Sequence, residues 1–254
     1  MATKLTVDIG AIQLFLGDSG YGSKAPRIAL ARFGKADVRV YAKQMEPARL
    51  AAELFGALLA RTAGFRAPHP GLAFDETTGL WWFTSRQRAS PDLSRRFSIG
   101  QVPGPAQREA FAAAAAWITS RRQFPAMVAW DEWINNRDRN LQNLLVEGDD
   151  FSLIDHEQAF DCHDDERADV NKMAQLVNAT LDPIAQMRVK SGAVAGAMTF
   201  SPDWTRLVHD ILSPLPAKAV KNVGIIRHWT EARYPSTVQR VERRIAGGQS
   251  NLAL

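Results

Sequence analysis

The sequence predicts an α+β fold with two lobes, an N-terminal antiparallel β-sheet lobe with one helix and a larger, mainly helical C-terminal lobe. Three observations support this prediction. Up to Ser85, short runs alternate apolar and polar residues, as half-buried strands do. Beyond Pro91, apolar residues recur at helical spacing. Within that helical part, "NLLVE" and "FSLID" flank a "GDD" turn and predict one embedded hairpin. We therefore expect lobes at 1–89 and 90–254.

The N-terminal lobe is built from strands around a single helix. Glu46-Pro47 is typical of a helix start, with proline at the first helical position, and the helical pattern closes on Gly64. A loop with three glycines, "GDSGYGSKAP", joins the first two strands, and "DETTG" joins the last two. The expected strands are Ala11–Gly17, Arg27–Phe33, Asp37–Met45, Pro70–Phe74 and Leu80–Ser85.

The C-terminal lobe starts with an irregular stretch, Ser90–Ala106, and continues with helices. The expected helices are Gln107–Arg121, Pro125–Ile134, Ala168–Leu181, Trp204–Leu212, Ala217–Trp229 and Ser236–Ala246.

Composition excludes several classes of protein. The single cysteine, Cys162, rules out an internal disulfide and suits a reducing compartment, so we expect a cytoplasmic protein. No stretch approaches the roughly 20 apolar residues of a membrane span, and Met1–Gly10 lacks a signal pattern. The net charge is +4, with arginines concentrated near the C-terminus. They alternate with glutamates, which favours a solvated helix face over a nucleic-acid patch.

Polar residues gather around the predicted hairpin. Asp138 and Asn143 lie on the loop before its first strand, and Asp155 follows its second strand. Because a tight hairpin returns the chain to its start, we expect Asp155 beside Asn143. Two carboxylates and an amide oxygen suit Mg²⁺, which proteins hold with few carboxylates plus substrate phosphates. Taken singly, Asp138 and Asn143 also fit turn residues, and Asp155 fits a helix cap.

A second set of polar residues belongs to the N-terminal lobe. Lys43 is the only lysine of a half-buried strand and needs a partner or a ligand. Glu53 lies at the edge of the apolar face of the following helix, so we expect a Lys43–Glu53 ion pair; Glu46 is the competing partner. The glycine loop would let backbone amides approach phosphates, although such loops are also common structural turns.

The order of these parts is that of protein-kinase-like phosphotransferases: glycine-rich hairpin, strand lysine, helix glutamate, Asp-x4-Asn, hairpin and aspartate. The segments "WINNRDRNLQNLLV" and "LIDHEQAF" resemble HipA-like kinases and are similar to related phosphatidylinositol-kinase-like bacterial proteins. The strand-lysine and helix-glutamate stretch from Val40 to Pro70 resembles the same family. The resemblance extends from about Ile12 to Leu176.

The resemblance implies a role for each residue. Lys43 binds the ATP phosphates, Glu53 orients Lys43, and Asp138 is the catalytic base. Asn143 and Asp155 coordinate Mg²⁺. The expected nucleotide-binding residues are Gly17, Gly20, Gly22 and Ser23 in the loop, Lys43, and Phe83 and Ser85 near the hinge. Ser19 and Ser23 are the candidates for autophosphorylation of the loop.

Two features depart from these relatives, and a third observation rests on the local sequence alone. Full-length HipA toxins carry an additional N-terminal subdomain, whereas this chain begins almost at the glycine-rich hairpin, so their antitoxin and DNA contacts are not carried over. Conventional kinases place lysine two residues after the catalytic aspartate, where this chain has Asn140. Arg139, His156 or the metal ions would then neutralise the γ-phosphate. Finally, no serine, threonine or tyrosine lies between Asp155 and Lys172, which excludes phosphorylation there.

The sequence therefore predicts an ATP- and Mg²⁺-dependent kinase. The resemblance alone implies a protein serine or threonine as acceptor, and a kinase of toxin type or one regulated by an antitoxin or another protein. One alternative is a small-molecule or lipid-headgroup kinase. The other is a catalytically inactive kinase-fold binding or scaffold protein.

Overall fold

A computed structural model describes residues 5–19, 26–87, 90–160 and 169–246. Its contacts divide the chain into two compact units, each assembled from three segments. The first unit comprises Met1–Ala89, Leu153–Gln158 and Asp203–His228, and the second comprises Ser90–Ser152, Ala159–Pro202 and Trp229–Leu254.

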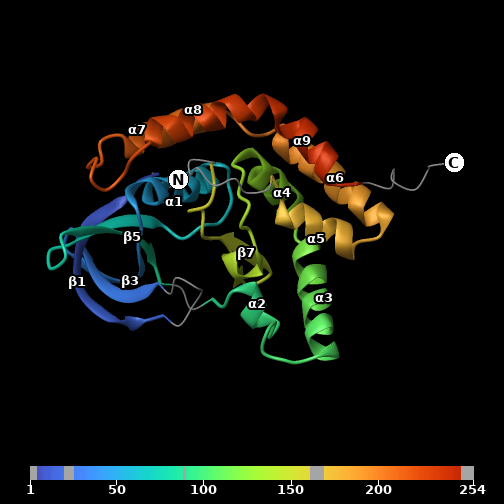
Figure 1. Ribbon diagram of the computed structural model, residues 1–254, viewed down its shortest axis with the longest axis horizontal. Coiled ribbons are helices and arrows are strands. Elements are labelled where there is room, and N and C mark those ends of the chain that lie inside the picture. Colours follow the sequence, from blue (N-terminus) through green and yellow to red (C-terminus); the bar gives the residue numbers. More distant parts are fainter. Residues whose placement is uncertain (1–4, 20–25, 88–89, 161–168, 247–254) are drawn as a thin grey trace. The chain divides into compact units, whose positions relative to one another are not determined.

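The sheet of the first unit closes into a barrel with the strand order β1-β2-β3-β5-β4 (Figure 1). The strands are β1 (Asp8–Asp18), β2 (Arg27–Phe33), β3 (Ala36–Gln44), β4 (Pro70–Asp75) and β5 (Leu80–Arg86). All neighbouring pairs are antiparallel except β1–β4, which is parallel. The mixed α+β class and the antiparallel pairs are confirmed. The sequence did not predict the closure, because the β1–β4 pair joins strands far apart in the chain.

Small side chains fill the barrel. Ala29, Ala31, Ala42 and Ala73 are fully buried and pack with Val40 and Trp82 in one cluster. A barrel of few strands has a narrow interior, so alternating alanines fit where larger residues would collide. This packing fixes which residues of β3 face outward, and Lys43 is among them.

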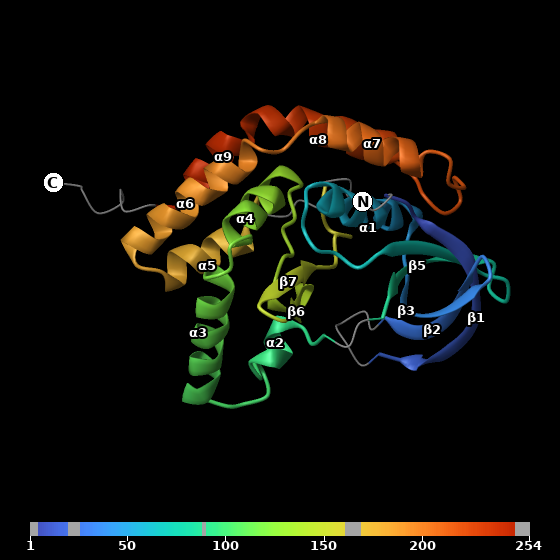
Figure 2. The ribbon, with the colours of Figure 1, turned by 180° about the vertical axis from the view of Figure 1, so that it is seen from behind.

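Helix α1 (Pro47–Thr62) is the buried helix of the first unit. Proline stands at its first turn as expected, and every residue from Leu50 to Ala60 is buried. It contacts β4 and β5, and α7 (Asp203–Leu212) packs against it. Both views show α7 alongside α1 (Figures 1 and 2). The last helix with residues in this unit is α8 (Val223–Arg233), which starts later than expected.

The second unit is mainly helical. Its elements are α2 (Leu93–Arg96), α3 (Pro105–Thr119), α4 (Phe124–Trp133), the 3-10 turn η1 (Leu141–Asn143), β6 (Leu144–Glu147), β7 (Asp150–Leu153), α5 (Lys172–Thr180), α6 (Pro183–Ala197), the 3-10 turn η2 (Tyr234–Ser236) and α9 (Thr237–Arg244). The strands β6 and β7 form the predicted hairpin. Helices α4, α6 and α9 pack against one another (Figure 2).

Helix α6 was not predicted. Its apolar residues lie on both faces, with Ile184 and Met187 more than half exposed, so no helical stripe marks it. Glycine explains how it packs. A Cβ added at Gly196 would lie 2.8 Å from the Cα of Ala126, so the two helix backbones approach closely there. None of the helices in the described ranges is long and apolar enough to cross a membrane.

Candidate active site

In the first unit, Lys43 is hydrogen-bonded to Asp155. The lysine Nζ lies 3.0 Å from the aspartate Oδ1, and both side chains are about three-quarters buried. Asp155 follows β7 and adopts φ +65°, a left-handed conformation that aspartate tolerates better than most residues. The pair brings the predicted phosphate-binding lysine and a predicted metal ligand into direct contact.

Among the described residues, Glu53 makes no direct contact with Lys43, where an ion pair was expected. Its carboxylate accepts a short hydrogen bond from the backbone N–H of His156 instead. A buried N–H needs an acceptor, and Glu53, only 3% exposed, provides one. The expected ion pair is therefore corrected: within the described chain, the lysine ammonium contacts Asp155, and Glu53 holds the next residue.

We call Lys43, Glu53 and Asp155 the Lys43 cluster, in which two carboxylates act on one ammonium. Burial alone would lower the pKa of Lys43, but the negative charges of Asp155 and Glu53 outweigh it and raise the pKa above its ordinary value. Burial raises the pKa of Glu53, against the opposing effect of Lys43. The lysine thus stays protonated, as a phosphate ligand must.

One stripe of α1 holds the segment that follows β7. Arg49, Glu53 and Gly56 lie on the same face of the helix, at i, i+4 and i+7. Arg49 pairs with Glu157 at 3.7 Å. Gly56 receives the side chain of His156, which is 1% exposed. His156 therefore packs against α1, and its burial excludes it as the cation for a γ-phosphate.

In the second unit, asparagines hold the loop Asp138–Asn143, which we call the catalytic loop. Asn143 Nδ2 donates to the carbonyl oxygen of Asp138 at 3.0 Å, and Asn140 Nδ2 donates to the same oxygen at 3.2 Å. The Asp138 N–H donates to Asn136 Oδ1 at 3.3 Å. These bonds fix the backbone of Asp138 on both sides. With its nitrogen engaged, Asn143 offers its oxygen as a ligand.

Arg139 anchors the catalytic loop from the protein interior and does not reach the surface of the loop. Its side chain is fully buried, and its Nε lies 3.1 Å from Asp131 Oδ2 of α4. A further bond runs from its Nη1 to the carbonyl of Asn143. Burial raises the pKa of Asp131 to about 6, although Arg139 lowers it. The expectation that Arg139 neutralises the γ-phosphate is therefore wrong, because this guanidinium is committed to the core.

Sequence reasoning missed the cation that does contact the predicted catalytic base. Lys172, the first residue of α5, places its Nζ 2.7 Å from Asp138 Oδ1. The two residues are 34 positions apart. No motif spacing signals this pair; only the fold of the second unit brings them together.

The remaining predicted residues lie mainly around β1 and β5. Gly17 stands near the end of β1 with φ +138°, and Gly20, Gly22 and Ser23 lie outside the described residues. Phe83 is buried on β5 directly opposite Lys43, and Ser85, half-buried, lies opposite Tyr41. The sequence predicts that Asn143 and Asp155 lie side by side. Asn143 belongs to the second unit and Asp155 to the first, so their proximity stays a prediction.

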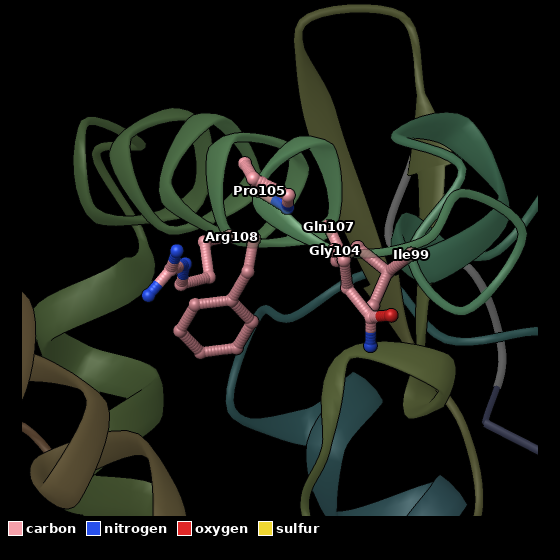
Figure 3. A pocket seen from close by; sticks show the side chains of 6 residues that line it. Ile99, Gly104, Pro105, Gln107 and Arg108 are labelled. Atoms are coloured by element: carbon pink, nitrogen blue, oxygen red, sulfur yellow. The ribbon is translucent and has the colours of Figure 1, made fainter.

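A surface hollow of about 470 Å³ lies elsewhere in the second unit (Figure 3). It is formed by the connection after α2 and the first turns of α3. Its lining residues are Ile99, Gly104, Pro105, Gln107, Arg108 and Phe111. None of them belongs to the Lys43 cluster or the catalytic loop.

Comparison with known proteins identifies a similar fold and a family. A Helicobacter pylori proinflammatory kinase, CtkA, has a similar solved structure, with a TM-score of 0.55 and 10% sequence identity, covering 93% of this chain and 96% of that one. At this identity the likeness shows the fold alone. A search of curated proteins finds no match. The family model of HipA-like kinases matches residues 19–191, well over half of the sequence. The chain belongs to the HipA-like kinase family.

Proposed function

We propose that the protein is an ATP- and Mg²⁺-dependent phosphotransferase that phosphorylates serine or threonine in a protein. The observation that carries the proposal is the Lys43–Asp155 hydrogen bond, with Glu53 bound to the backbone N–H of His156. Protein kinases bring a strand lysine and a metal-binding aspartate to the phosphates of ATP, and here Lys43 and Asp155 lie in direct contact. Membership of a kinase family supports the same reaction.

In the first unit, Lys43 binds the ATP phosphates. Glu53 acts on it indirectly, because it fixes the peptide that follows Asp155 and so fixes the carboxylate that holds the lysine. Phe83 and Ser85 contribute to the adenine site from β5. Gly17, with the loop that holds Gly20, Gly22 and Ser23, provides backbone amides for the phosphates.

Asn143 and Asp155 are the proposed Mg²⁺ ligands, each in its own unit. Their oxygens are of the hard type that this ion prefers. No group of three or more His, Cys, Asp or Glu in the described part of the chain could hold a metal. An ion at Asn143 and Asp155 would also need oxygens of the substrate phosphates. When bound, Mg²⁺ would neutralise charge on the β- and γ-phosphates.

Asp138 is the proposed catalytic base. Its side chain is 44% exposed, so an acceptor hydroxyl can reach the carboxylate. The asparagines of the catalytic loop hold the backbone of Asp138 and so fix where its side chain begins. The acceptor oxygen loses its proton to Asp138 as it bonds to phosphorus, and ADP leaves with the electrons of the broken bond. Because the chemistry is chiefly positioning, this rigidity contributes to the rate.

The acceptor is the finer part of the proposal. We favour a protein serine or threonine, with a toxin-type activity controlled by an antitoxin or another regulatory protein. A small-molecule or lipid-headgroup acceptor uses the same residues, and an inactive scaffold would bind nucleotide without turnover.

The test is incubation of the purified protein with labelled ATP and Mg²⁺, alone and with cell lysate. Asp138→Asn and Asp155→Asn should each lower transfer by about 100-fold or more. The matched control is Asp149→Asn, on the exposed hairpin turn, which should keep full activity. A labelled protein band supports the protein acceptor, and a labelled metabolite or lipid supports the alternative. Transfer that survives in both site variants would refute the assignment.

A further inference from the structure

We propose that Lys172 is a catalytic residue that binds the γ-phosphoryl oxygens during transfer, an inference that rests on the proposed function. The observation is its 2.7 Å contact with Asp138 Oδ1. Lys172 is 40% exposed and Asp138 is 44% exposed, so the pair lies where solvent and substrate can reach it. An ion pair this exposed contributes little to stability, so a variant that loses it should still fold.

The chain holds Lys172 in place from two sides. Asn171 caps α5 by accepting from the Ala174 N–H at 3.0 Å, and its Nδ2 donates to the Val128 carbonyl of α4 at 2.9 Å. Two residues earlier, the carboxylate of Asp169 is bound by Arg240 at 2.7 and 2.8 Å. Lys172 therefore projects from a fixed helix start, although a lysine there is disfavoured by the helix dipole.

Two other residues of the catalytic loop, Arg139 and Asn140, are already committed. Arg139 is buried against Asp131. Asn140, which stands where conventional kinases have their lysine, accepts from the Gln142 N–H and donates to the Asp138 carbonyl. Lys172 is the cation that contacts the carboxylate of Asp138 in the described chain, and it supplies the charge that Asn140 lacks.

Lys172 and Asp138 change partners during the reaction. Before substrate binds, the ammonium of Lys172 neutralises the carboxylate. When ATP and the acceptor hydroxyl arrive, Lys172 moves to the γ-phosphoryl oxygens and Asp138 becomes free to accept the hydroxyl proton. The new bond joins the acceptor oxygen to phosphorus, the bond from phosphorus to the bridging oxygen of ATP breaks, and ADP leaves. The ammonium stabilises the charge on the oxygens in transit.

Lys172→Met and Lys172→Arg test this role, with Lys218→Met, an exposed lysine of the other unit, as the control. We expect Lys172→Met to lower kcat by about 100-fold, with partial recovery in Lys172→Arg and no change in the control. Calorimetry provides a second readout. A non-hydrolysable ATP analogue should lose affinity in Lys172→Met, whereas ADP, which lacks the γ-phosphate, should bind unchanged.

The outcomes separate the two proposals. Active wild type with Lys172→Met at nearly wild-type kcat overturns this inference alone. Equal loss of affinity for the analogue and ADP assigns Lys172 a merely structural role and also overturns it. Wild-type protein that neither binds ATP nor transfers phosphate overturns the proposed function, and this inference falls with it.

Discussion

Gly56 of α1 and His156 approach each other so closely that a Cβ added at Gly56 would lie 2.4 Å from the His156 Cβ. A glycine inside a helix costs about 1 kcal/mol relative to alanine. Close packing explains it here, because the residue after Asp155 occupies the space of the missing side chain. The contact ties α1 to the segment that carries the proposed metal ligand.

Gly56→Ala should therefore destabilise the protein by about 1–3 kcal/mol, as overpacking does, despite the better helix propensity of alanine. It should also lower phosphotransfer, because a displaced His156 moves Asp155 away from Lys43. Chemical denaturation and the labelled-ATP assay measure the two effects. Gly224→Ala is the matched control: Gly224 also lies in a helix, but its added Cβ meets nothing within 4 Å. Equal stability of the two variants would contradict the packing argument.

Local pattern predicted most elements of the first unit. The strand Arg27–Phe33 was expected with the bounds that the structure has, and α1 begins at Pro47 as expected. The alternation of apolar and polar residues and the position of a proline are local features, so the elements that they predict also form in the folded chain. The closure of the barrel was missed because it depends on pairing between strands far apart in the chain. Helix α6 was missed because it depends on glycine-mediated packing against α4.

The candidate site shows the same limit. Motif spacing selected Lys43, Glu53, Asp138, Asn143 and Asp155, and the structure brings them into two clusters, one in each unit. Spacing did not predict their partners. Glu53 satisfies a backbone N–H rather than Lys43, and Lys172 contacts Asp138 from a distant helix start. Satisfaction of a buried N–H decided the Glu53 contact, and the tertiary fold of the second unit decided the Lys172 contact.

Glu53→Gln should change how stability depends on pH. The pKa of Glu53 is raised by burial, so the folded state holds its proton to higher pH than the unfolded state. This group therefore stabilises the fold most at low pH, and the contribution is lost as pH rises from its ordinary value of 4.5 through the raised pKa. Glutamine cannot ionise but can still accept from His156. Unfolding free energies at about pH 5 and about pH 8 should differ less in the variant than in wild type. An unchanged difference would argue against a raised pKa.

Asp131→Asn should destabilise the protein by about 3–5 kcal/mol, because Arg139 would remain charged and buried without its carboxylate. Replacing both partners, as Asp131→Leu with Arg139→Met, should recover most of that stability. It should not recover phosphotransfer, since the bond from Arg139 to the Asn143 carbonyl is also lost. Denaturation midpoints and kinase assays on both variants give the comparison. A stable single variant would show that the charge is compensated elsewhere.

Activity should not depend on phosphorylation of the stretch between Asp155 and Lys172, which has no hydroxyl side chain. Mass spectrometry of the active protein should find no activity-controlling phosphosite in that stretch. Loss of activity on dephosphorylation, traced to this stretch, would contradict the prediction.

Asp169→Asn should weaken the clamp that positions Lys172. Arg240 binds both carboxylate oxygens of Asp169, and Arg244 Nη2 lies 2.5 Å from Oδ1. Burial would raise the pKa of Asp169, but these arginines lower it below its ordinary value of 3.8. The stabilising contribution is thus present above that value and lost as pH falls through the lowered pKa. The variant should be less stable by about 1 kcal/mol near neutral pH. The effect is this small because the Asp169 side chain is about half exposed, so solvent screens its charge.

That loss of stability should disappear in acid, below the pKa of the wild-type carboxyl. The variant's kcat should fall while its affinity for ADP stays unchanged, because Asp169 acts only through the start of α5. Asp203→Asn is the matched control: its carboxylate also pairs with an arginine, Arg206, but at an exposed helix start in the other unit. If both variants lower kcat equally, Asp169 has no positioning role. If only Asp169→Asn lowers kcat, the arginines of α9 set the position of Lys172 through Asp169.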